Sequence, residues 1–184
     1  NTRASAGVDA LSHAVESAVT RTRNPISDAL AGEAWRLLDS AFDLYYRSPD
    51  NAEVAGDVLV GAHLAGMAVE ASMLGAAHAC ANPLTTRYGI VHGTAVALML
   101  PHVVRFNAEP DDRLYARFGG AGCLIDRLSE LMHRTGLPER LSACGVQESD
   151  LGTLAQEAES QWTGAHNPRA VDRDAFMSLY ASAL

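Results

Sequence analysis

Apolar side chains recur every three or four residues along most of the chain, the spacing of one face of an α-helix. In the best-defined stripe, Leu30, Leu38 and Tyr45 share a face that carries no charged residue. The pattern predicts helices at about 4–23, 27–47, 52–80, 92–107, 111–118, 122–135, 149–162 and 172–183. No stretch alternates convincingly with a period of two, so we expect no sheet. Residues 1–184 are therefore predicted to form a single all-α domain, a multi-helix bundle.

The longest predicted helix, at 52–80, is rich in alanine and glycine. Each glycine costs a helix interior up to about 1 kcal/mol, so such a density indicates helices that pack closely together. The glycines in this range are Gly56, Gly61, Gly66 and Gly75. We expect this helix to be central and to be broken by Asn82 and Pro83, because proline disfavours helical conformation at the residue before it.

Length and composition suit a globular domain with its own core. The chain has 184 residues, of which 48% are hydrophobic. No run reaches the roughly 18–20 consecutive apolar residues of a membrane-spanning helix, and no signal peptide opens the chain. Three scattered cysteines (Cys80, Cys123 and Cys144) favour a reducing cytoplasm over a disulfide framework. We expect a cytoplasmic protein without a membrane partner. Since the chain opens without Met, we also expect it to be a piece of a longer protein.

The charge balance excludes several classes of function. The net charge is −8, and all fourteen basic residues are arginine. Without a lysine, neither a Schiff base nor a phosphate-binding P-loop is possible. An acidic chain with no basic stripe also argues against nucleic-acid binding. Small molecules, another domain or a second copy of the chain are the expected partners, and the oligomeric state stays open.

Candidate chemistry gathers in two segments. Residues 75–102 place His78, Asn82 and His92 among small apolar residues, and Asp9 and His13 lie four residues apart near the start. That spacing puts both side chains on one helix face, and a turn between His78 and His92 can bring their rings together. One carboxylate with several imidazoles is the ligand set of a divalent transition metal. A surface pair and hydrogen-bonded core histidines are the alternatives.

Three motifs carry a resemblance to a known family. They are GVDALSHAVES, GAAHACANPLTTRYGIVHGTAVALMLPHVVRFN and, near the end, HNPR. Their order and separation resemble the C-terminal domain of the iron-containing alcohol dehydrogenases, a helical fold of the dehydroquinate synthase-like type. The resemblance implies that Asp9, His13, His78 and His92 bind Fe(II) or Zn(II). It also implies an alcohol or aldehyde substrate, and an N-terminal nucleotide-binding domain that supplies NAD or NADP in the complete enzyme.

Two departures from the family pattern bear on activity. The nucleotide-binding half is absent, so we expect this fragment to be inactive alone. Many family members carry a histidine where this chain has Asn82, which cannot titrate but can orient a substrate by hydrogen bonding.

Other interpretations stay open from the sequence. Glu16 is either a hydrogen-bond partner of the ligands or a surface carboxylate. The domain as a whole could instead be a helical metal-dependent hydrolase module, or a non-catalytic helical scaffold that associates through its small-residue faces.

Overall fold

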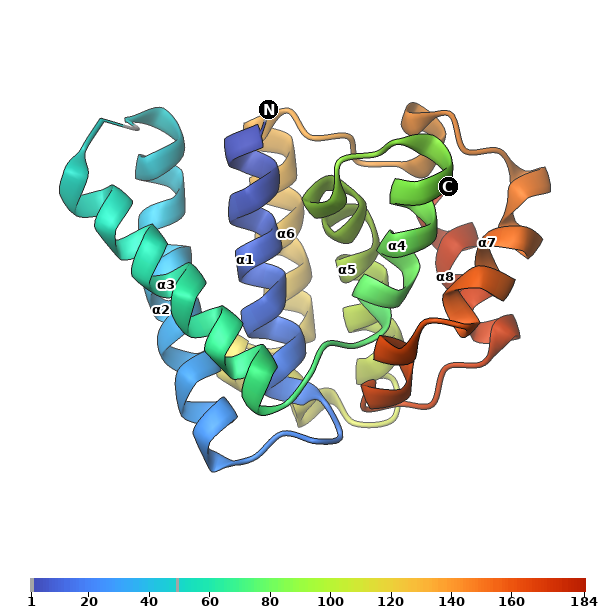
Figure 1. Cartoon of the computed structure of the whole chain (residues 1–184), viewed down its shortest axis with the longest axis horizontal. Coiled ribbons are helices and arrows are strands. Elements are labelled where there is room, and N and C mark those ends of the chain that lie inside the picture. The colour runs from blue at the N-terminus through green and yellow to red at the C-terminus, as the bar shows by residue number, and fades with distance from the viewer. Residues whose placement is uncertain (1, 49) are drawn as a thin grey trace.

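The computed structural model describes residues 2–48 and 50–184, which fold as helices joined by turns (Figure 1). No strand occurs among these residues, which confirms the all-α prediction. The α-helices are α1 (Thr2–Val19), α2 (Pro25–Arg47), α3 (Ala52–Ala71), α4 (Ala76–Tyr88), α5 (His92–Ala108), α6 (Ala121–Thr135), α7 (Leu151–Glu159) and α8 (Arg173–Ala183). Short 3₁₀ helices lie between them: η1 (Asp112–Phe118), η2 (Leu141–Cys144), η3 (Glu148–Asp150) and η4 (Trp162–His166).

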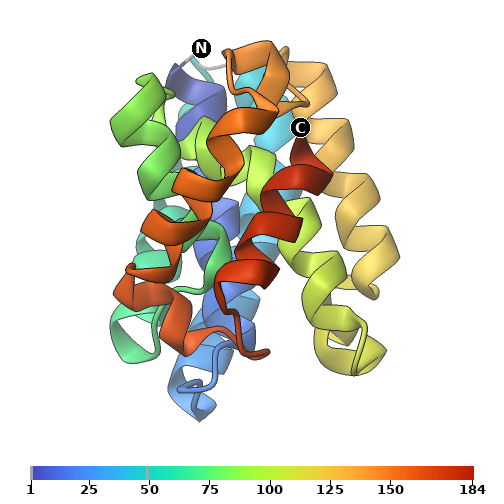
Figure 2. The same cartoon turned by 90° about the vertical axis from the view of Figure 1, so that its right-hand side faces the viewer.

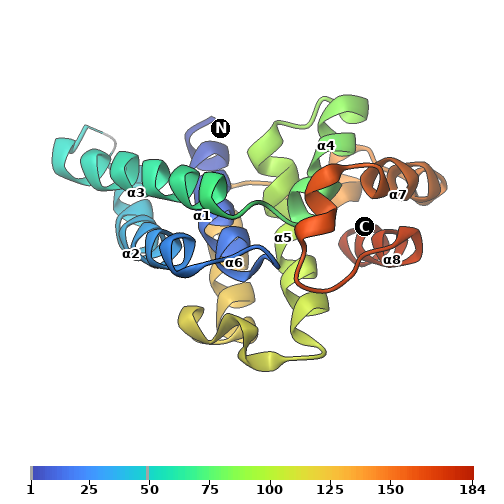
Figure 3. The same cartoon turned by 60° about the horizontal axis from the view of Figure 1, so that its bottom comes forward.

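Helices α1 and α5 form the centre of the bundle. Figure 1 shows the α2–α3 pair on one side and α7 with α8 on the other, and the end-on view of Figure 3 keeps this order. Helix α1 packs against α2, α3 and α5, whereas α5 packs against α1, α4, α6 and α8. Figure 2 shows α7 and α8 covering the α4–α5 side of the bundle. The contact between α1 and α5 therefore joins the two halves of the domain.

A glycine at the start of α5 permits this central contact. A Cβ atom added to Gly93 would lie 2.2 Å from the backbone oxygen of Ser5 and 2.9 Å from Cβ of Asp9. Real Cβ atoms do not approach other atoms so closely, because cores are already close-packed. The missing side chain thus lets the first turn of α5, which carries His92, lie directly against α1.

The first interhelical turn differs from the prediction. Helix α1 ends at Val19 instead of continuing to about residue 23. Asn24 caps the start of α2, since its side-chain oxygen accepts hydrogen bonds from the backbone N–H groups of Ile26 and Ser27. Pro25 takes the first helical position, where no backbone N–H is needed. Between the helices predicted at 27–47 and 52–80, Pro49 lies outside the described residues.

The predicted helix at 52–80 is wrong in its boundaries. The chain leaves the helix after Ala71 and re-enters it at Ala76, and α4 then continues through Pro83. Distant side chains stabilise the break: Asn24 donates to the carbonyl of Ala71, and Thr22 donates to that of Ser72. These bonds satisfy carbonyls that a helix end leaves free. Such partners, 47 and 50 residues away, have no local sequence signal.

Helix α3 is peripheral, so the expectation that it is central is also wrong. Its outer side exposes Leu59, Val60 and Met67, and an added Cβ atom at Gly56 or Gly66 would meet nothing within 4 Å. By length and composition alone this helix could cross a membrane, since it has 20 residues and a mean hydropathy of 1.3. A single apolar helix of this kind is weak evidence for a membrane span.

Candidate metal centre

One face of α1 carries three of the site residues. Asp9, His13 and Glu16 follow one another at about one helical turn, so their side chains point the same way. His78 lies in the first turn of α4, and His92 is the first residue of α5. The close approach at Gly93 brings the start of α5 to this face of α1. Three helices therefore converge on one point.

The predicted ligands meet at one carboxylate oxygen. Oδ1 of Asp9 lies 3.5 Å from Nε2 of His78, 3.7 Å from Nε2 of His13 and 4.0 Å from Nε2 of His92. The ligand atoms of Asp9, His78 and His92 all lie within 4.8 Å of one another. His13 borders this trio, with its ring centroid 5.0 Å from that of His78.

Two buried atoms of this cluster lack a hydrogen-bond partner among the residues that the structure describes. They are Oδ1 of Asp9 and Nε2 of His78, which face each other. A buried polar atom without a partner costs about 1–3 kcal/mol, so an arrangement of this kind calls for an explanation. Four ligand atoms around a tetrahedral zinc ion, each about 2.0–2.1 Å from the metal, lie about 3.4 Å apart. The ligand atoms of Asp9, His78 and His92 lie somewhat farther apart than this, within 4.8 Å of one another, and their chemistry fits a divalent cation.

Electrostatics keep the carboxylate charged and two of the imidazoles neutral. Burial raises the pKa of Asp9, but its interactions with the surrounding histidines outweigh burial and lower it. Burial, together with the neighbouring His78, lowers the pKa of His13 and of His92. Burial also acts to lower the pKa of His78, yet the interactions with Asp9 and Glu16 raise it to about 9. The cluster therefore offers an anionic oxygen beside two neutral imidazoles, and a metal ion bound there would replace the second proton of His78.

The cluster is closed on one side and open on the other. The His78 side chain is 4% exposed, whereas those of Asp9, His13 and His92 are 24%, 29% and 39% exposed. The cluster is therefore buried at His78 and reaches solvent mainly at His92.

Asn82 lies one turn after His78 on α4 and is half-buried. Its side-chain amide donates a 2.9 Å hydrogen bond to Oε1 of Gln161, just before η4. This bond orients the amide and leaves its oxygen able to accept a hydrogen bond. The partner Gln161 was not predicted from the sequence, because 79 residues separate the two.

Glu16 is a hydrogen-bond partner of a candidate ligand and not a surface carboxylate. It is 3% exposed, and its Oε2 lies 2.6 Å from Nδ1 of His78. The sequence placed it near His13, its neighbour on α1, but the fold directs it to α4. The sequence left both interpretations of Glu16 open and gave no signal that the ligand it contacts is His78.

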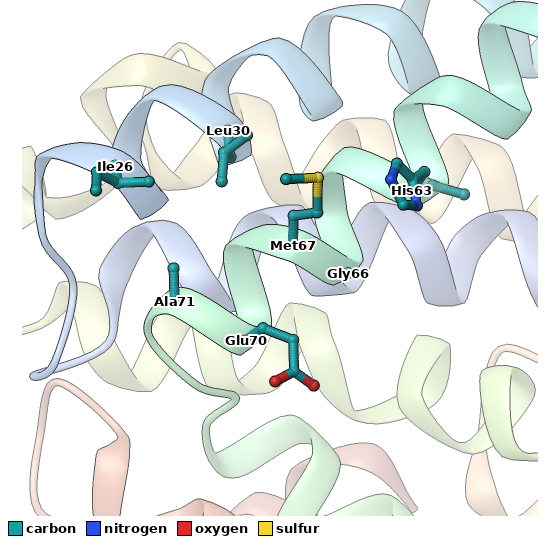
Figure 4. A pocket seen from close by; sticks show the side chains of 8 residues that line it. Ile26, Leu30, His63, Gly66, Met67, Glu70 and Ala71 are labelled. Atoms are coloured by element: carbon teal, nitrogen blue, oxygen red, sulfur yellow. The ribbon is translucent and has the colours of Figure 1, made fainter.

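The remaining histidines lie outside the cluster and have other roles. His102 contacts Ser182, His133 pairs with Glu139, and His166 contacts Thr22. His63 lines a surface hollow of about 670 Å³ between α2 and α3 (Figure 4). The hollow is mainly apolar, with Ile26 and Met67 in its wall, and includes none of the candidate ligands.

Comparison with known proteins places the whole domain in one family. Residues 3–184 match the model of the Fe-containing alcohol dehydrogenase family, C-terminal. Alcohol dehydrogenase 4 of Schizosaccharomyces pombe is 33% identical over 98% of this chain and 45% of its own length.

Solved structures agree with this placement. The alcohol dehydrogenase from Oenococcus oeni is 26% identical, with a TM-score of 0.94 over 99% of this chain and 51% of that one. Sulfoacetaldehyde reductase from Bifidobacterium kashiwanohense, in complex with NAD+, is 26% identical, with a TM-score of 0.89 over 98% of this chain and 50% of that one. The chain spans about half the length of the relatives that it matches. It belongs to the iron-containing alcohol dehydrogenase family and corresponds to the C-terminal domain of its members.

Proposed function

We propose that this domain is the metal-binding, substrate-side half of an NAD(P)-dependent alcohol dehydrogenase or aldehyde reductase. The observation that carries the proposal is the convergence of three imidazole nitrogens within 4.0 Å of one buried oxygen of Asp9. We assign Asp9, His13, His78 and His92 as ligands of Fe(II) or Zn(II). A divalent cation held there would act as a Lewis acid on the oxygen of an alcohol or aldehyde during hydride exchange with a nicotinamide.

Each side chain has a part that follows from its surroundings. Asp9 supplies the negative charge, and its low pKa keeps that charge at neutral pH. His13 and His92 supply neutral imidazoles, because burial disfavours their protonation. Asn82 is held by Gln161, and its free oxygen can accept a hydrogen bond from a substrate hydroxyl. Asn82 cannot titrate, so any proton relay runs through another group.

The partner of this domain is proposed to be an N-terminal nucleotide-binding domain. The support is that the relatives are about twice as long as this chain, and that one similar structure was solved with NAD+. The two domains would meet over the open, His92 side of the cluster, where a small substrate can enter. We propose the cytoplasm as the location, because all three cysteines are free thiols.

Elemental analysis of the complete protein tests this function, beside its His92→Ala and His63→Ala variants. His92 is partly exposed, so its removal should spare the fold, and His63 is the matched control outside the cluster. We expect about one Fe or Zn per chain in the parent and in the control, and its loss in His92→Ala. Alcohol-dependent reduction of NAD+ or NADP+ should be present in the parent and in His63→Ala, which bind the metal, and absent in His92→Ala.

Two results would contradict the proposal. Full metal content in His92→Ala would remove His92 from the ligand set. A complete protein that takes up neither Fe(II) nor Zn(II) after anaerobic reconstitution would refute the metal-dependent function.

A further inference from the structure

The buried carboxylate of Glu16 divides its two oxygens between two different partners. Oε2 lies 2.6 Å from Nδ1 of His78, and Oε1 accepts a 2.8 Å hydrogen bond from the backbone N–H of Ala77. All of these contacts are buried. A buried carboxylate needs such partners, because an unpaired charge in a protein interior is costly. Both partners belong to the first turn of α4, whereas Glu16 belongs to α1.

This contact determines which nitrogen of His78 is free. A neutral imidazole carries one proton, and the nitrogen without it is the one that binds a metal. An ionised carboxylate only accepts hydrogen bonds, so Nδ1 of His78 must donate to Glu16. When a metal ion replaces the second proton of the ring, the lone pair that it meets is therefore on Nε2, which points to Asp9 at 3.5 Å.

A second buried side chain holds the same turn of α4 without touching the imidazole. Oδ1 of Asn167, in the HNPR motif, accepts a 3.2 Å hydrogen bond from the backbone N–H of Ala76. Asn167 is itself held by two hydrogen bonds to Asn107. Gly75 makes room for both acceptors, because a Cβ atom there would lie 2.9 Å from Glu16 Oε1 and 3.0 Å from Asn167 Oδ1. A substitution of Asn167 therefore tests the anchoring of α4 without changing the hydrogen bond that orients the His78 ring.

We propose that Glu16 is a positioning residue for the metal centre: it selects the His78 tautomer that directs Nε2 to the cation site. This inference rests on the proposed metal-binding function. Glu16 acts through His78 and does not itself reach the cluster of Nε2 atoms. The HNPR loop supports the same turn through Asn167, so its part is structural.

Glu16→Gln changes the tautomer of His78 while it keeps the size and shape of the side chain at position 16. Glutamine has the same size, but the Ala77 N–H requires an oxygen acceptor, so the glutamine NH₂ group faces Nδ1 of His78. Nδ1 must then accept a hydrogen bond, the proton moves to Nε2, and the wrong nitrogen is free. Loss of a hydrogen-bond partner of a ligand typically lowers metal affinity about 10–100-fold.

The experiment measures the Zn²⁺ dissociation constant of the complete protein by chelator competition, together with its thermal unfolding. We expect about 10–100-fold weaker binding in Glu16→Gln. Asn167→Ala should lower the unfolding temperature and bind Zn²⁺ within about threefold of the parent, since it leaves the tautomer unchanged. Glu139→Gln alters an exposed histidine–carboxylate pair, at His133, and is the matched control with unchanged affinity.

The outcomes distinguish this inference from the function on which it rests. A parent protein that binds neither Zn²⁺ nor Fe²⁺ overturns both. Tight binding by the parent and equally tight binding by Glu16→Gln overturns only the role of Glu16, as does an equal loss of affinity in Glu16→Gln and Asn167→Ala.

A measurement on the unaltered protein needs no variant to fold. In the Zn²⁺-loaded parent, ¹H–¹⁵N spectra of the histidine side chains should show a proton on Nδ1 of His78 and none on its Nε2. A proton on Nε2 would overturn the assignment.

Discussion

A substitution of Gly93 by alanine would test the central contact of the fold and the metal centre together. The new Cβ atom would lie 2.2 Å from the backbone oxygen of Ser5, whereas ordinary contact begins at 3.4 Å. Helices α1 and α5 must then separate by about 1.2 Å, because neither backbone has a flexible end that can move aside. Overpacking of this kind costs about 1–3 kcal/mol.

The expected effect on stability follows from the size of the domain. For a domain of 150–250 residues, each 1 kcal/mol shifts the unfolding temperature by about 2–4 °C, so Gly93→Ala should lower it by about 2–12 °C. The same displacement moves His92 away from Asp9. The distance between Nε2 of His92 and Oδ1 of Asp9, now 4.0 Å, would increase further. Zn²⁺ affinity should therefore fall at least about tenfold.

Calorimetry and chelator competition on the complete protein measure both effects. Gly56→Ala is the matched control, because a Cβ atom there meets nothing within 4 Å and Gly56 lies inside helix α3. We expect that control to be more stable than the parent by about 0.4–1 kcal/mol, since alanine restricts the unfolded chain. If Gly93→Ala kept both the unfolding temperature and the Zn²⁺ affinity of the parent, α1 and α5 would not meet as closely as described.

Three further predictions concern the metal, position 82 and acid stability. When free Zn²⁺ is present at 1,000 times its dissociation constant, its removal should lower the free energy of unfolding by about 4 kcal/mol and the unfolding temperature by about 8–16 °C. A thermal scan with and without chelator measures this. An unchanged unfolding temperature in a sample shown to contain Zn²⁺ would contradict ligands that are held together by the fold. Asn82→His should keep the metal but change the pH–rate profile of the complete enzyme, because it adds a group that titrates near 6.5. An unchanged profile would show that the residue at position 82 takes no part in proton transfer. Burial, with the charge of Arg105, lowers the pKa of His102 to about 4, so its unfolded form binds a proton below about pH 6.5 that the folded form refuses until about pH 4. The free energy of unfolding should therefore decrease as the pH falls from about 6.5 to about 4, and it should decrease less steeply in His102→Gln. Equal slopes of the two proteins in acid unfolding curves would refute this role of His102.

Several elements of the structure follow from local sequence alone. Helix α5 was expected at 92–107 and spans His92–Ala108, and α6 was expected at 122–135 and spans Ala121–Thr135. In α6 the apolar stripe of helical period continues without a proline, and in α5 it continues through Pro101. The pairing of Asp9 with His13 has the same local origin, since four residues in a helix place two side chains on one face.

The break between α3 and α4 did not follow from local sequence. Pro83 is the strongest local helix breaker in this region, yet α4 continues through it. Its ring is buried within the bundle, and packing there outweighs the roughly 3 kcal/mol that a proline costs a helix interior. The actual break, after Ala71, is stabilised by hydrogen bonds from Asn24 and Thr22. A local pattern cannot anticipate bonds between residues so far apart in sequence.

The sequence by itself determined the helical class, the types of ligand and the family resemblance, because helical periodicity and residue chemistry are local properties. Only the tertiary structure decided that the three Nε2 atoms meet at one oxygen of Asp9, and that Glu16 bonds to His78 and not to its neighbour His13. These contacts depend on how α1, α4 and α5 pack. That packing is set by backbone approach at Gly93 and Gly75, where the absence of a side chain leaves no hydrophobic signal to read.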